Sequence, residues 1–290
     1  MRPNTVKRIV VIGAGIMGLD IAQIFAGSNY DVLIRDINDE VIQNAKFRLD
    51  KTLDKQISKG KLDQARKKSI IDKLTFTTDL NLAANADLVV EAAVENLEIK
   101  RKVFTQLDNI CNMSTIFASN TSSISITAIA AATRRSDKFI GIHFFNPANV
   151  MKLVEIIRGA NTSDDTFDTV FKLVKAIGKE PVSVHEAPGF VVNKILVPMI
   201  NEACDIVDQG ISSIEDVDKA MRLGANHPMG PLALGDLIGL DICLAAMDTL
   251  YSETHDSKYR ASLLLRKMVR AGQLGRKTGK GFYDYPDSDA

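Results

Sequence analysis

The sequence predicts an α/β chain in which a doubly wound sheet is followed by an all-α domain. Short β-branched strands alternate with helical segments as far as residue 185, and from residue 186 the strand pattern gives way to helices. A glycine-rich turn after the first strand opens the first helix. We therefore expect one domain over residues 1–185 and a second over residues 186–290.

The glycine-rich turn has the spacing of a dinucleotide-binding loop. Gly13, Gly15 and Gly18 lie between a β-branched run at 7–12 and an apolar helix at 19–26. In that context the first glycine permits a tight turn, the second lets a pyrophosphate approach, and the third lets helix and strand pack closely. The helix N-terminus then receives the diphosphate. This predicts a Rossmann-type domain.

An acidic residue in the second strand predicts the cofactor. Asp36 lies at the end of the run 31–36, 18 positions after Gly18. A carboxylate there accepts hydrogen bonds from ribose hydroxyls and repels a ribose phosphate, which favours NAD (NADH) over NADP. Arg35 is the one neighbour that works against this preference.

A helical hairpin interrupts the first domain at residues 38–74, where a plain crossover needs only one helix. Gly60 separates its two arms. Lys51, Lys55 and Lys59 recur every four residues and share one face. The face is either a basic ridge for a phosphorylated substrate or an ordinary solvated helix surface.

Polar residues follow two neighbouring strands of the predicted sheet. The segment 119–123 comes directly after an apolar strand at 115–118, and His143 ends the next one. Ligands of an open α/β sheet bind at the carboxyl ends of its strands, so we expect Ser122 and His143 to face one cleft with the glycine loop.

The cleft predicts acid–base chemistry. Glu155 lies twelve residues after His143 in the following strand, and a hairpin would place its carboxylate beside the imidazole. The ring can then exchange a proton with an alcohol whose carbon gives hydride to NAD. Ser122 and Asn193 are candidates to hydrogen-bond the same oxygen. Nucleophilic catalysis by serine lacks a GxSxG turn, and a satisfied core histidine is the non-functional alternative.

Two further groups have competing interpretations. Glu95 and Lys100 follow the strand at 87–92 and are either cofactor contacts or a helix cap and a surface lysine. The basic glycine-rich segment 275–283 is either a flap that carries Lys277 over the site or a simple surface turn.

Charge balance, hydropathy and cysteine spacing argue against several classes of protein. Lys plus Arg and Asp plus Glu number 36 each, and this balance argues against a broad nucleic-acid surface. No apolar run reaches the roughly 18 residues of a membrane span, and no secretory signal is evident. Cys111, Cys204 and Cys243 are far apart, so we expect no metal site and a cytoplasmic protein.

The second domain is rich in aliphatic residues. Helices are expected at 190–208 and 262–271, and a largely apolar stretch covers 232–253. An apolar helical unit of this kind commonly packs against a second copy, so we expect a homodimer.

Several motifs together resemble the L-3-hydroxyacyl-CoA dehydrogenase family. The HFFNP and PGFVVN runs are far more specific than the glycine loop, and the matching stretches occur in the right order along the whole chain. They are residues 13–18, 119–123, 143–148, 151–155, 187–193 and 224–231.

The resemblance implies a reaction and its partners. The family oxidises a (S)-3-hydroxyacyl-CoA with NAD to a 3-oxoacyl-CoA and NADH, reversibly, and this chain is most similar to the bacterial branch that acts on 3-hydroxybutyryl-CoA. The resemblance leaves the physiological direction open between oxidation, as in fatty-acid breakdown (β-oxidation), and reduction, as in butyrate formation (butanoate metabolism). The resemblance also implies closure of the two domains over the thioester.

The resemblance assigns roles to individual residues. It implies that His143 is the acid/base, that Glu155 is its partner, and that Ser122 and Asn193 flank the reacting oxygen. Coenzyme A phosphates would meet Lys51 and Lys55. The implied cofactor contacts are Gly13, Gly15, Ile16, Met17, Gly18, Asp36, Glu95, Lys100, Asn120, Ser122, His143, Asn146 and Lys277.

Two other functions remain open at this point. One is a dehydrogenase for a free 3-hydroxy acid or for a longer or dicarboxylic acyl-CoA, and the lysine-bearing hairpin argues against the free acid. The other is a non-enzymatic dinucleotide sensor. A protein that only binds a dinucleotide needs neither His143 nor Glu155, so the presence of this pair favours an enzyme.

Overall fold

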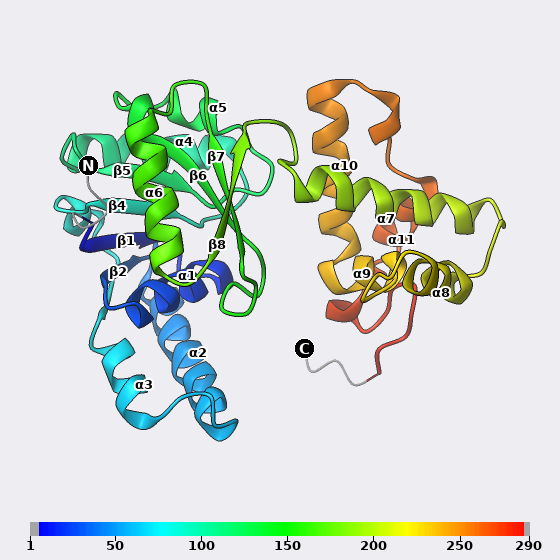
Figure 1. The fold of residues 1–290 in the computed structure, drawn as a ribbon, viewed down its shortest axis with the longest axis horizontal. Helices are drawn as coiled ribbons and strands as arrows, with labels where there is room; N and C mark the ends of the chain where they lie inside the picture. The colour runs from blue at the N-terminus through cyan, green and yellow to red at the C-terminus, as the bar shows by residue number, and fades with distance from the viewer. Residues whose placement is uncertain (1–5, 287–290) are drawn as a thin grey trace. The chain divides into compact units, whose positions relative to one another are not determined.

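Eight strands form a single sheet in the computed structural model, which describes residues 6–286 (Figure 1). Their order is β3-β2-β1-β4-β5-β6-β7-β8. Strands β1 to β6 run parallel, β7 is antiparallel to β6, and β8 is parallel to β7. The strands are β1 (Arg8–Ile12), β2 (Asp31–Arg35), β3 (Leu74–Thr77), β4 (Leu88–Glu91), β5 (Ile116–Ser119), β6 (Phe139–Phe144), β7 (Leu153–Arg158) and β8 (Glu180–His185). The first six have the order of a doubly wound Rossmann sheet, so the predicted fold class is confirmed.

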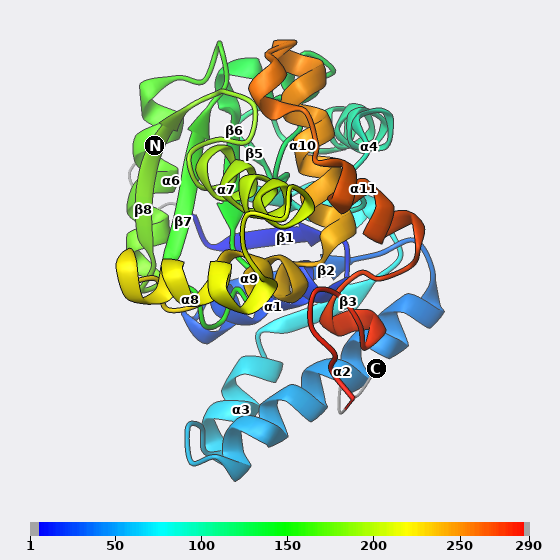
Figure 2. The same cartoon turned by 90° about the vertical axis from the view of Figure 1, so that its right-hand side faces the viewer.

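Helices cover the sheet in the first of two units, which runs to Ala187. They are α1 (Ile16–Gly27), α2 (Asp39–Ser58), α3 (Gln64–Ile71), α4 (Leu97–Ile110), α5 (Ile126–Ala130) and α6 (Asp164–Ala176), with single 3₁₀ turns at Leu80–Ala83 and Ser136–Lys138. Figures 1 and 2 both show α2 and α3 extending away from the sheet as a pair. This pair is the predicted helical hairpin.

Local chemistry fixes the hairpin. Asn38 and Asp63 precede α2 and α3, and each side chain accepts a hydrogen bond from the N–H three residues on. Lys67 of α3 lies 2.6 Å from Asp50 and 2.7 Å from Asp54 of α2. Ion pairs of this exposure contribute little singly to stability.

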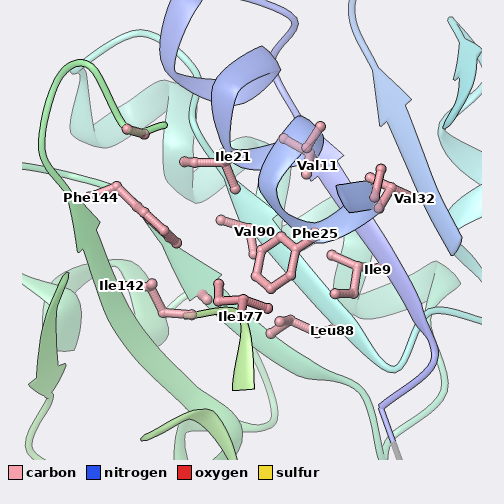
Figure 3. Packing of buried hydrophobic residues seen from close by; sticks show 14 of the residues in the cluster. Ile9, Val11, Ile21, Phe25, Val32, Leu88, Val90, Ile142, Phe144 and Ile177 are labelled. Atoms are coloured by element: carbon pink, nitrogen blue, oxygen red, sulfur yellow. The ribbon is translucent and has the colours of Figure 1, made fainter. Parts of the chain in front are cut away.

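The core of the first unit lies between the sheet and its helices. Figure 3 shows Ile21 and Phe25 of α1 against Ile9 of β1 and against Leu88 and Val90 of β4. All five side chains are fully buried. Each such burial stabilises the fold by about 1.5–3 kcal/mol, and together they hold α1 on the two strands that border the glycine loop.

The second unit begins at Pro188 and is helical. Its helices are α7 (Val192–Asp208), α8 (Ile214–Gly224), α9 (Pro231–Ile238), α10 (Leu240–Thr254) and α11 (Leu263–Arg270), with 3₁₀ turns at Ser257–Tyr259 and Arg276–Thr278. The apolar stretch 232–253 is not one element. Gly239 adopts φ +107°, which only glycine adopts readily, and this residue separates α9 from α10.

The second unit has its own apolar core, built from α7 to α11.

Among the described residues, no helix is both long and apolar enough to cross a membrane.

Candidate active site

The glycine loop, the serine-rich segment and the predicted histidine lie along one edge of the sheet. Strands β1, β4, β5 and β6 are parallel, and the register pairs Ile12 with Glu91, Glu91 with Ser119, and Ser119 with Gly141. His143 follows two residues later on β6. The carboxyl ends of β1, β5 and β6, which carry the glycine loop, the serine-rich segment and the histidine, therefore lie on one edge of the sheet, with β4 between β1 and β5.

The glycine loop is packed tightly against the end of β4. Gly13 has φ +104°, and a Cβ there would lie 2.6 Å from the carbonyl oxygen of Ala92. A Cβ on Gly18 would lie 1.9 Å from the carbonyl oxygen of Gly13, whereas a Cβ on Gly15 would meet nothing within 4 Å. The loop thus needs glycine at its first and third positions and is open at its second, where a pyrophosphate would approach.

The start of α1 suits an anion. The helix begins at Ile16, and no side chain caps its first N–H groups. Ile16 is exposed and Met17 is half-buried at this end of the helix. The N–H groups and the helix dipole fit the diphosphate of a dinucleotide, and both residues stay predicted contacts.

Asp36 and an arginine from the hairpin hold the loop from two sides. Asp36 accepts hydrogen bonds from the N–H groups of Ala14 and Ile37, each at 2.6 Å. Arg48 of α2 donates from Nη2 to the carbonyl oxygen of Ala14 at 2.8 Å. A carboxylate has further lone pairs, so Asp36 retains the capacity to accept ribose hydroxyls.

A charge cluster lies where β4 ends, with Lys100 and Glu91 buried and Glu95 exposed. The Lys100 Nζ is 2.7 Å from Glu91 Oε1 and 3.2 Å from Glu95 Oε2. Glu91 Oε2 also accepts a hydrogen bond from Ser119 Oγ at 2.6 Å. Lys100 is only 1% exposed, so the alternative interpretation of a surface lysine is wrong. A buried ammonium requires such partners.

Glu95 ties this cluster to the serine-rich segment. Its Oε1 accepts hydrogen bonds from Thr121 Oγ1 at 2.6 Å and from the Ser122 N–H at 2.9 Å. Burial raises the pKa of Glu95, but Lys100 and these hydrogen bonds outweigh it, and the pKa lies below its usual value. The cap of α4 is Asn96, so the helix-cap interpretation of Glu95 is also wrong.

Asn120 joins two strand ends. Its side-chain oxygen accepts a hydrogen bond from the Phe144 N–H at 2.9 Å, and its own N–H donates to the Glu91 carbonyl at 2.7 Å. The residue therefore fixes the end of β5 to the ends of β6 and β4. Its predicted contact with the cofactor stays a prediction.

The histidine and its carboxylate form a buried pair. His143 and Glu155 face each other across the antiparallel strands β6 and β7, as the twelve-residue spacing predicts. The ring Nδ1 lies 2.8 Å from Glu155 Oε2, and the residues are 6% and 1% exposed. Because a carboxylate only accepts, Nδ1 carries the hydrogen, so in the neutral ring Nε2 is the nitrogen with the accepting lone pair.

Asn146 and the two lysines of the ridge lie on the surface. Asn146 follows β6 and is joined to Pro147 by a cis peptide bond. Lys51 and Lys55 are exposed on α2, and neither makes an ion pair with another described residue. Their proposed contacts with cofactor and coenzyme A stay predictions.

Two predicted residues belong to the second unit. Asn193 is the second residue of α7. Lys277 lies in the 3₁₀ turn and forms an ion pair with Asp241 of α10. The segment around Lys277 is anchored because the buried Asp236 accepts hydrogen bonds from the Phe282 and Tyr283 N–H groups, both at 3.0 Å. The roles of Asn193 and Lys277 also stay predictions.

Sequence reasoning missed two residues that shape this edge, Arg48 and Glu91, and it included Ser119 and Thr121 only as members of the segment 119–123, without a role of their own. The signal for Glu91 is its type, because a carboxylate that ends a fully buried strand requires a charged partner. Arg48 gives no such signal, since a single arginine on an amphipathic helix is ordinary.

Comparison with known proteins decides the family. A model described as the NAD binding domain of 3-hydroxyacyl-CoA dehydrogenase matches residues 8–187, and the model of the C-terminal domain matches residues 189–285. The chain belongs to the 3-hydroxyacyl-CoA dehydrogenase family. The resemblance inferred from the motifs is thereby confirmed, as is NAD as the cofactor.

Relatives of this 3-hydroxyacyl-CoA dehydrogenase cover nearly its whole length. The 3-hydroxybutyryl-CoA dehydrogenase of Clostridioides difficile is 55% identical over 96% of this chain and 99% of its own. The human mitochondrial hydroxyacyl-coenzyme A dehydrogenase is 42% identical over 97% and 91%, respectively. The crystal structure of (S)-3-hydroxybutyryl-CoA dehydrogenase from Ralstonia eutropha has a TM-score of 0.94 and 49% identity, covering 98% of this chain and 100% of that one.

Proposed function

We propose that this enzyme catalyses the reversible NAD-dependent oxidation of (S)-3-hydroxybutyryl-CoA to acetoacetyl-CoA. The relatives named for this substrate support the acyl group, and the buried His143–Glu155 pair, on the same edge of the sheet as the glycine loop, supports the chemistry. That pair is the observation that carries the proposal, because a dinucleotide sensor needs no oriented base.

His143 acts as the acid/base. In the oxidative direction its Nε2 takes the proton of the 3-hydroxyl, and NAD, when bound, would supply the acceptor for the hydride that leaves C3. Glu155 accepts from Nδ1, which holds the ring orientation and stabilises the imidazolium that forms. In the reductive direction the same imidazolium returns the proton to the developing alkoxide.

The remaining residues of the first unit bind and orient. The glycine loop and the first turn of α1 receive the pyrophosphate, and Asp36 accepts the ribose hydroxyls. Ser122, whose N–H and hydroxyl are held by Glu95, hydrogen-bonds the substrate oxygen. Asn193 remains a predicted substrate contact, and Lys277 a predicted cofactor contact.

Coenzyme A is the preferred carrier because of the hairpin. Lys51 and Lys55 are exposed on one face of α2, and the neighbouring carboxylates of Asp50 and Asp54 are occupied by Lys67. Two adjacent ammonium groups attract phosphates, and a free 3-hydroxy acid has none.

Substrate tests separate the possible activities. NADH absorbance is followed as acetoacetyl-CoA is added, with free acetoacetate, a longer 3-oxoacyl-CoA, a dicarboxylic 3-oxoacyl-CoA and NADPH in parallel. We expect rapid loss of absorbance with acetoacetyl-CoA and NADH. Binding of NADH without any loss would favour the sensor, and a faster loss with another substrate would replace the proposed acyl group.

We also propose a homodimer that resides in the cytoplasm. The second unit exposes Ile195, Leu223 and Leu263 at 69%, 74% and 75%, respectively, which suits a surface that is covered by a second copy. Its free cysteines suit a reducing compartment. Sedimentation equilibrium tests the assembly, and a mass of one chain at micromolar concentration would contradict it.

A further inference from the structure

A buried lysine holds the connection between β6 and β7. Lys179 precedes β8 and is 8% exposed. Its Nζ donates to the carbonyl oxygens of Ala148 at 2.6 Å and Met151 at 2.7 Å. One ammonium therefore fixes both ends of a tight segment in the hairpin that carries the catalytic pair.

An aspartate from the cofactor helix holds the same segment. Asp20 of α1 accepts a hydrogen bond from the Ala148 N–H at 3.1 Å. Ala148 is thus held through its N–H by Asp20 and through its carbonyl by Lys179. The three elements joined in this way are α1, the β6–β7 connection and the start of β8.

The two charges act on each other inside the protein. Burial lowers the pKa of Lys179, and the carboxylate of Asp20 opposes that shift. Burial raises the pKa of Asp20, while hydrogen bonds from Ala148 and Asn149 and the charge of Lys179 lower it. A burial penalty on both members of a pair is retained only where their hydrogen bonds offset it.

We propose that Lys179 and Asp20 are positioning residues that keep the His143–Glu155 hairpin in place relative to the cofactor helix. The connection they hold lies between His143 and Glu155 in the chain, and α1 begins at the pyrophosphate loop. The hydrogen bonds of both residues go to the β6–β7 connection. A shift of about 1 Å in a reacting group can cost roughly 100-fold in rate, so loss of this clamp reduces kcat. This inference rests on the proposed role in catalysis of the β6–β7 hairpin, which carries His143 and Glu155.

The first test compares Lys179→Met with two control variants. Lys172→Met changes an exposed lysine of α6, and Val174→Ala removes buried apolar volume from the same helix. We expect Lys179→Met to lower kcat by about 10- to 100-fold at a temperature where the chain is fully folded. Val174→Ala should lower Tm and keep kcat within about threefold of wild type, since its cavity acts on stability.

A double-mutant cycle separates positioning from stability. Asp20→Leu should lower kcat as well, while Asp20→Asn, which retains an oxygen acceptor, should restore much of it. Because both partners hold Ala148, adding Asp20→Leu to Lys179→Met should cost little more in kcat. Should the Lys179→Met chain fail to fold, the comparison of Asp20→Leu with Asp20→Asn answers the same question.

The outcomes are distinct. Wild-type kcat in Lys179→Met and Asp20→Leu, or losses that multiply in the double variant, would overturn the clamp and leave the proposed function intact. An inactive wild type would overturn the proposed function and the clamp together. A loss of kcat that follows Tm equally in Lys179→Met and Val174→Ala would show a structural role only.

Discussion

Replacing Glu155 by glutamine tests the orientation of His143. The substitution keeps the shape of the side chain and removes its charge from a pair in which the side chains are 8% and 1% exposed and the joined atoms 2.8 Å apart. A hydrogen bond to a charged group contributes about 1.5–3 kcal/mol. If this contribution is realised when the imidazolium forms in the transition state, kcat falls by about 10- to 150-fold at 1.36 kcal/mol per factor of ten.

The assay is the initial rate of NADH oxidation at saturating acetoacetyl-CoA. Glu155→Gln should lose kcat within that range and keep its dissociation constant for NADH, since the glycine loop and Asp36 are untouched. Glu180→Gln, at an exposed position on β8, is the matched control and should behave as wild type. A kcat for Glu155→Gln within threefold of wild type would refute the role given to the carboxylate.

Three further predictions concern the glycine loop, the helical hairpin of α2 and α3, and the charge cluster around Lys100. Arg48→Ala removes the hydrogen bond to the Ala14 carbonyl and should raise the NADH dissociation constant about three- to tenfold in a fluorescence titration, whereas Lys46→Ala on the same helix should not. Lys51→Ala/Lys55→Ala should raise the KM for acetoacetyl-CoA about three- to tenfold with a modest loss of kcat. An unchanged KM would show that the two lysines belong to an ordinary solvated helix surface and do not bind coenzyme A. The folded pKa of Glu95 is lowered, so its charge stabilises the fold above the ordinary value of 4.5, and this contribution is lost as pH falls through the folded pKa. The urea midpoints of wild type and Glu95→Gln should therefore converge in acid, and a constant difference from neutral pH to about pH 3 would contradict the shift.

The sheet was predictable because its signals are local. A parallel strand buried on both faces is a continuous β-branched run, and the strand expected at 87–92 spans Leu88–Glu91 in the structure. The glycine loop was also predictable from the sequence, because a few nearby backbone atoms leave no room for a Cβ at Gly13 and Gly18. The hairpin that pairs His143 with Glu155 follows from a short connection between two apolar runs.

The charge cluster was only partly predictable. The sequence places Glu95 and Lys100 after a strand and does not reveal that Glu91 turns Lys100 inward, since this depends on burial set by β5 and α4. Arg48 and Lys179 present the same difficulty. Each reaches a backbone carbonyl more than 30 residues away in the chain, and no periodic pattern records such a contact.

The break between α9 and α10 shows a second limit of prediction from the sequence. The run 232–253 is largely apolar, and a glycine within it is compatible with a continuous helix. The break falls at Gly239, whose φ is positive and whose Cβ, if present, would lie 3.0 Å from side-chain atoms of both Asp241 and Lys277. The apolar pattern alone does not reveal where the first helix ends.

The most direct measurement of the central claim is the turnover and NADH binding of His143→Gln in one preparation. General acid–base catalysis by a positioned side chain contributes about 10²- to 10⁴-fold, so we expect a loss of acetoacetyl-CoA reduction within or beyond that range and a dissociation constant for NADH close to wild type. Turnover near the wild-type rate, with NADH bound, would contradict the assignment of His143 as the acid/base.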